Sequence, residues 1–217
     1  SKVLLLSGLI VLGLTVLGLS AFVQMRQYNA IVNETNQRIL QRSNILDEVQ
    51  SAAVEFKTQV QELKNILIRG NVPEQFTRYS EGFAKSAAGV QRHLHKVLML
   101  QKEEKLDTSA IELLLKEHEQ LGKNYLEALQ KFDQSDINAG KVVDKLVSGM
   151  DRAASKQMET LAAETSAGFE DYLLESDKNR DQLYSNTIQL LMILCIGASL
   201  VIISVMAVIF RDLFKIL

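Results

Sequence analysis

Cationic and amide side chains that could hold an anion fall in two short stretches of the 217-residue sequence. They are Lys64, Asn65, Arg69 and Arg152. Lysine and arginine bind carboxylates through charge-assisted hydrogen bonds, and an asparagine amide both donates and accepts. These residue types predict a site for a small carboxylate ligand, far along the chain from both ends.

The same stretches also suit a structural role. Counted back from the apolar run near the C-terminus, Arg152 lies about 35 residues, or roughly 53 Å, along a helix, and Glu62 falls at the same height on an earlier helix. Glu62 and Lys64 would then pair with Arg152 and Asp151 across antiparallel helices. Exposed pairs of this kind contribute ~0–1 kcal/mol each. We favour this pairing and keep the ligand site as the alternative.

The three histidines are the remaining candidates for chemistry. His118 lies about as far after the turn near Lys105 as His93 and His95 lie before it, so one of them could join it, with a nearby glutamate, as a zinc ligand set. However, residues two apart point to different faces of a helix. We therefore expect ordinary interface histidines, with no metal, haem or other cofactor.

Composition excludes several other classes. The net charge is −2 and no basic patch appears, which argues against nucleic acid as a partner. The single cysteine, Cys195, cannot form an intrachain disulfide. No nucleophile–base spacing and no phosphate-binding glycine loop occurs, so we do not expect an enzyme.

Two charge-free apolar runs decide the general class. They cover residues 3–23 and 190–210, and about 20 such residues in a helix span the core of a bilayer. A cleaved signal peptide is the alternative for the first run, but a signal core has only roughly 7–15 apolar residues. We expect two transmembrane helices, at residues 1–23 and 188–210.

The flanks of these runs predict the orientation. Lys2 precedes the first run, and Arg211 and Lys215 follow the second. By the positive-inside rule both flanks face the cytoplasm. Residues 24–187 would then form a domain on the outer side of the membrane, and residues 211–217 would begin a cytoplasmic segment.

The middle segment predicts an all-α fold, an antiparallel up-down-up-down four-helix bundle continuous with both transmembrane helices. Its first helix carries a heptad seam with alternating steps of four and three: Tyr28, Val32, Thr35, Ile39, Arg42, Leu46, Val49, Ala53, Phe56, Val60, Leu63 and Leu67. We expect two copies of the chain to meet along this seam. Gly70 and Pro73 predict the end of this helix and the start of the next.

The later helices follow from similar signals. The second helix should run from about Pro73 to Gln101, and Ser109 with Glu112 has the spacing of a capping box that opens the third. The fourth should start near Ile137 and continue without a break into the second apolar run, because no proline interrupts it.

Two segments resemble motifs of bacterial methyl-accepting chemotaxis receptors. They are FKTQVQELKNILIRG at residues 56–70 and AGKVVDKLVSGMDR at residues 139–152. Both are similar to the periplasmic four-helix sensor domain in one branch of that family. Leu63 departs from the pattern, where the family has tryptophan. The resemblance implies a sensor between two membrane spans, followed in the family by a HAMP relay and a cytoplasmic signalling rod.

The function predicted is a transmembrane signal-sensing module. It would be a homodimer in the lipid bilayer that responds to a small molecule or to a periplasmic binding protein carrying one. Residues 175–186, which contain no glycine or proline, would pass the signal into the second span. An accessory or scaffold subunit of a membrane complex is the alternative, and a haem- or metal-binding bundle is a third.

Overall fold

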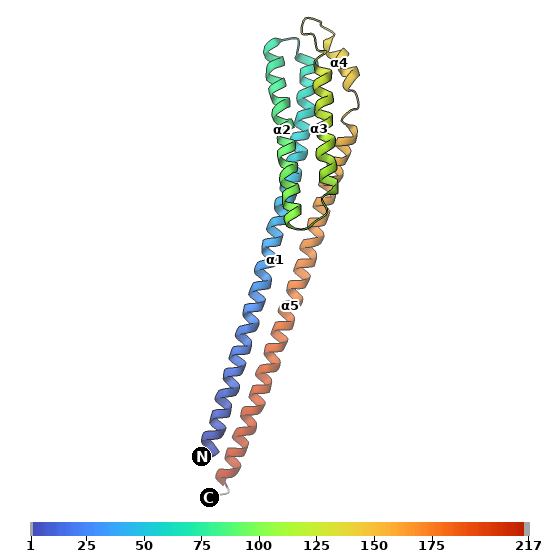
Figure 1. The fold of residues 1–217 in the computed structure, drawn as a ribbon. Helices are drawn as coiled ribbons and strands as arrows, with labels where there is room; N and C mark the ends of the chain where they lie inside the picture. The colour runs from blue at the N-terminus through green and yellow to red at the C-terminus, as the bar shows by residue number, and fades with distance from the viewer. Residues whose placement is uncertain (1, 215–217) are drawn as a thin grey trace. The chain divides into compact units, whose positions relative to one another are not determined.

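The computed structural model describes residues 2–214, which form five helices and no strand. The helices are α1 (Lys2–Arg69), α2 (Pro73–Glu103), α3 (Ser109–Leu129), α4 (Ala139–Val147) and α5 (Arg152–Phe214) (Figure 1). The predicted all-helical class is confirmed for these residues. The end of α1 and the start of α2 also fall where Gly70 and Pro73 predicted them.

The chain divides into two compact units. The core unit is Leu40–Asp171, and the two-helix unit contains the described residues before and after it, which belong to α1 and α5. The two units are defined by how compactly their residues pack and not by the position of a membrane. The predicted lipid boundaries at residues 23 and 188 therefore stay predictions. The side chains of Lys2 and Lys215, on which the predicted orientation partly depends, lie outside the part of the chain that the structure describes.

In the two-helix unit, α1 and α5 contain the apolar segments. Each helix is long and apolar enough to cross a membrane by length and composition. Their apolar side chains are largely exposed; Val11 and Leu200, for example, are 64% and 59% exposed. Such surfaces are unfavourable in water, so these segments need a covering of lipid or protein.

The core unit buries one apolar cluster to which all five helices contribute. Apolar side chains of α2 and α3 belong to this core, including Phe83, Leu94 and Tyr125. The seam residues Val49 and Phe56 of α1 are buried there too. The chain's own helices already cover these two side chains, so a second copy could not contact them; the predicted dimer along the seam stays a prediction.

The prediction of one unbroken fourth helix is wrong. Residues 148–151 separate α4 from α5. Ser148 leaves the helical region with ψ 117, and Gly149 takes a positive φ of 78, which glycine adopts readily because it has no Cβ. After the break, the first buried side chains of α5 are Ala154, Met158 and Leu161.

The predicted capping box also differs from the structure. Thr108, not Ser109, precedes the first turn of α3. The Ser109 hydroxyl and backbone N–H both donate to Asp107 Oδ1, at 2.7 and 3.0 Å. An Asx-type turn has therefore taken the place of the capping box, because the aspartate two residues earlier competes for the same donor.

Candidate functional site

An open cavity on the core unit contains both cations and carboxylates. Its volume is about 460 Å³, and α1 and α5 line it together with Asp151. Its polar lining is Lys57, Gln61, Lys64, Asp151, Ser155 and Glu159. Phe56 and Met158, which belong to the buried core, form part of its apolar lining. This cavity, which we call the Lys64 groove, can hold a small polar molecule against an apolar floor.

Lys64 also lines a neighbouring cavity of about 530 Å³. Its other polar residues are Asn71, from the turn between α1 and α2, and Lys141 and Asp144 of α4. The Asn71 amide donates to the carbonyl oxygens of Gln134 and Asp136, at 3.0 and 2.7 Å, and so fixes the loop before α4. Lys64 is therefore the one residue of the predicted ligand set that lines both cavities.

The other predicted ligand residues do not join Lys64. Asn65 Nδ2 donates to Glu62 Oε2 at 3.3 Å. Arg69 Nη1 donates to the Tyr79 hydroxyl at 2.8 Å, so this cation points toward α2. The Arg152 side chain lies close to Gly149 at the helix break. The structure does not bring the four residues together into one site.

The predicted pairing of Glu62 with Arg152 does not occur among the described residues. The Glu62 carboxylate lies against Gly82 of α2 instead. Counting residues from the apolar run places Glu62 and Arg152 at the same distance along their helices. It does not determine which neighbouring helix each side chain faces. Asp151 and Lys64 do line the same groove, although no ion pair joins them in the described part of the chain.

One face of α1 carries charged side chains at seven-residue spacing toward α2. Glu48, Glu55, Glu62 and Arg69 each lie against an α2 residue. Glu48 Oε2 lies 2.6 Å from His93 Nδ1, and Glu48 also pairs with Lys96. Burial alone would raise the pKa of Glu48, but these two hydrogen bonds outweigh it and hold the pKa below its usual value.

A buried polar chain crosses the apolar core at His118. His118 Nε2 lies 2.8 Å from Gln59 Oε1, and the Gln91 amide lies 2.8 Å from His118 Nδ1. This arrangement fits a neutral imidazole that donates from Nε2 and accepts at Nδ1. Burial lowers the pKa of His118 from 6.5 to about 4. The Gln59 amide nitrogen has no hydrogen-bond partner, although the side chain is fully buried.

The three histidines are not neighbours in a metal site. His118 is in the core, His93 pairs with Glu48, and His95 is exposed. Among the residues that the structure describes, no three His, Cys, Asp or Glu side chains are grouped as a metal would require.

Gln59 and Gln91 were missed by sequence reasoning. Gln59 lies seven residues after Ala52 and seven before Ile66, both fully buried on α1. A polar residue at a buried heptad position was the available signal, because such a residue requires a partner inside the core.

The described chain is thus an all-helical protein with a core unit and two helices apolar enough to span a membrane. Over 124 residues, 56% of the chain, it is 36% identical to the methyl-accepting chemotaxis protein CtpH of Pseudomonas aeruginosa. The match covers 20% of that protein, so the chain corresponds to about a fifth of this relative's length. No protein-family model matches the chain. No solved structure matches it either. The match supports a relationship to chemotaxis receptors over this part of the sequence.

Proposed function

We propose that the chain is the transmembrane sensing module of a chemoreceptor-like protein in a bacterial inner membrane. In this proposal α1 and α5 each cross the bilayer, and the core unit is an antiparallel four-helix bundle on the periplasmic side. A ligand bound to the core unit would alter α5, which continues as a helix into the second span. The 124-residue match to a chemotaxis receptor carries this proposal.

The Lys64 groove is the proposed ligand site. Lys57 and Lys64 line it with ammonium donors for a small carboxylate, and Ser155 and Gln61 add neutral hydrogen-bonding groups. The groove involves both α1 and α5, the two helices that enter the proposed spans. A ligand held between them could favour one arrangement of α5, provided that it binds the two arrangements with different affinity.

A hybrid receptor tests this function. Residues 1–217 are joined to the HAMP relay and signalling rod of a chemoreceptor with a measured kinase output, and acetate, succinate and citrate are the probes. We expect at least one probe to change the output, and Lys64→Ala to reduce the response at least tenfold, since a charge-assisted hydrogen bond is lost. Lys116→Ala, an exposed lysine outside the groove, is the matched control.

Two results would count against the proposal. If a membrane-inserted hybrid ignores all three carboxylates, the ligand class is wrong. If Lys116→Ala reduces the response as much as Lys64→Ala, the groove is not the site, because the effect then reflects overall charge.

A further inference from the structure

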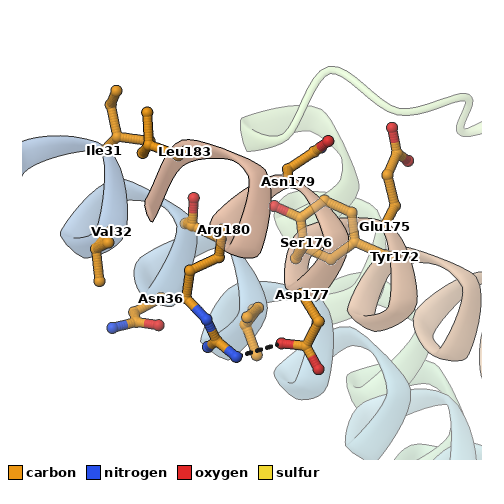
Figure 2. A pocket seen from close by; sticks show the side chains of 12 residues that line it. Ile31, Val32, Asn36, Tyr172, Glu175, Ser176, Asp177, Asn179, Arg180 and Leu183 are labelled. Carbon is orange, nitrogen blue, oxygen red and sulfur yellow. Dashed lines mark ion pairs between the residues drawn. The ribbon is translucent and has the colours of Figure 1, made fainter. Parts of the chain in front are cut away.

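A further cavity, separate from the two described above, lies between α1 and α5 in the two-helix unit (Figure 2). Its volume is about 190 Å³. Asn36 lines it from α1, and Ser176, Asp177 and Arg180 line it from α5. Sites for whole drug-sized ligands usually measure about 300–1,000 Å³, so this cavity suits a smaller chemical group.

Ser176 and Asn36 have no side-chain hydrogen bond within the part of the chain that the structure describes. Ser176 is only 7% exposed. Ser176 is largely shielded from water, so its hydroxyl favours a polar molecule in the cavity. Asn36 is exposed, and its amide is available to the same molecule.

The charges of the cavity have both signs. Arg180 Nη2 lies 2.9 Å from Asp177 Oδ1, as the dashed line in Figure 2 marks. The two side chains remain 48% and 63% exposed, so the other guanidinium N–H groups and the second carboxylate oxygen can still bind a ligand. Glu175 adds a further carboxylate to the lining. Adjacent opposite charges complement a zwitterion better than a simple anion.

The cavity also lies beside the apolar segments. The rings of Tyr28 and Tyr184 pack edge to face with centroids 6.4 Å apart, and tyrosines in such places sit at the level of lipid headgroups. Arg180 is one helical turn before Tyr184, about 6 Å along α5. Ile31 and Leu183 line the same cavity with apolar surface. The cavity therefore offers both polar and apolar surface next to the apolar segments.

We propose that this cavity binds the headgroup of a phospholipid that carries an ethanolamine phosphodiester. The phosphate accepts hydrogen bonds from Arg180, and the ammonium donates to Asp177, with Ser176 and Asn36 as further partners. Ethanolamine fits better than choline, because its ammonium has N–H donors and is smaller. Bound there, the lipid joins α1 to α5 at the membrane surface. This inference rests on the membrane insertion in the proposed function.

Lipid retention by the full chain tests the proposal. The chain is released from bilayer nanodiscs that contain equal amounts of ethanolamine, choline and glycerol phospholipids, and the retained lipids are identified by native mass spectrometry. We expect selective retention of the ethanolamine lipid, and about tenfold weaker retention in Arg180→Gln, which removes charge-assisted hydrogen bonds. Lys178→Gln, an exposed cation on the same helix that does not line the cavity, should retain lipid like the wild type.

A second variant keeps every charge. Ser176→Leu fills the cavity with an apolar side chain and should also lose the selective retention, while circular dichroism shows unchanged helicity. Equal retention of all three lipids, or equal retention by Arg180→Gln and the wild type, would overturn the proposal. So would tight binding of free O-phosphoethanolamine by the chain in lipid-free detergent, because the site would then serve a soluble ligand.

Two further outcomes separate the alternatives. If Arg180→Gln changes the oligomeric state and leaves lipid retention unchanged, a second copy of the chain occupies the cavity and the proposal is wrong. Protease accessibility in the same nanodiscs reports insertion independently. A chain that does not insert contradicts the proposed function, whereas an inserted chain without selective retention contradicts only the lipid site.

Discussion

At the scale of the residue, the most unusual group is the buried imidazole of His118. Its two ring nitrogens are both occupied by glutamine side chains at 2.8 Å. Protonation would put an N–H at Nδ1, opposite the Gln91 amide donor, within an apolar core. The fold therefore stabilises the neutral form, and acid should weaken it.

This gives a pH prediction with a definite sign. The pKa of His118 is about 4 in the fold and about 6.5 when unfolded, so stability falls as the pH drops from 6.5 toward 4, because the unfolded chain binds the proton first. Between pH 7.5 and pH 5 we expect His118 to lower the free energy of unfolding by about 2 kcal/mol. Urea unfolding of the full chain at both pH values measures it. His118→Gln should show a smaller loss, and an equal loss would assign the effect to other groups.

Gly140 makes a close approach that only glycine allows. A Cβ at this position would lie 1.9 Å from the carbonyl oxygen of Leu67 and 2.9 Å from its carbonyl carbon. The backbone of Leu67 cannot rotate away from an added methyl group as a flexible side chain could. Gly140→Ala should therefore destabilise the chain by roughly 1–3 kcal/mol. Gly122→Ala is the control, since nothing lies within 4 Å there, and it should stabilise α3 by about 0.5–1 kcal/mol. Thermal unfolding compares the two; similar behaviour would show that α4 yields to the extra methyl.

At the scale of the element, the break between α4 and α5 decides which residues of α5 face the core. Gly149 has φ 78, in the left-handed region. Gly149→Ala should cost about 1–2 kcal/mol of unfolding free energy. Gly168→Ala, inside α5 with open space around it, should be neutral or stabilising. Both are read by chemical unfolding of the full chain. An unchanged Gly149→Ala variant would mean that the backbone can form an alternative turn.

The stretch of α5 from residue 175 to 186 is helical throughout and contains no glycine or proline. A helix of this kind can transmit a displacement without bending. Inserting two glycines after Asp181 in the hybrid receptor should abolish the response of the kinase output to its carboxylate. Ligand affinity should stay the same, because the Lys64 groove lies in the core unit. A normal response after the insertion would exclude this segment as the route of the signal.

At the scale of the whole molecule, the orientation in the membrane is open to direct test. The positive flanks, Lys2 before the first apolar run and Arg211 after the second, predict that both ends lie in the cytoplasm. A reporter enzyme that is active only in the periplasm, fused after Leu217, should therefore be inactive. The same reporter inserted after Asp133, in the loop before α4, should be active. Activity at Leu217 would contradict the orientation.

The sequence by itself determined the features that depend on local turn chemistry and on the spacing of apolar residues along the chain. The turn at Gly70 and Pro73 was placed correctly. The two apolar runs were visible as composition, and the structure places them in helices long enough to span a bilayer.

Tertiary structure alone decided which faces meet. Glu62 is at the right height for Arg152, yet its helix face is turned toward Gly82 of α2. The Gln59–His118 contact joins residues 59 positions apart in the sequence. The positive φ of Gly149 divided a helix that the pattern predicted as continuous. The helical repeat determines which residues share a face of one helix. Which helix that face contacts depends on how all the helices pack together, and this packing is a property of the whole core.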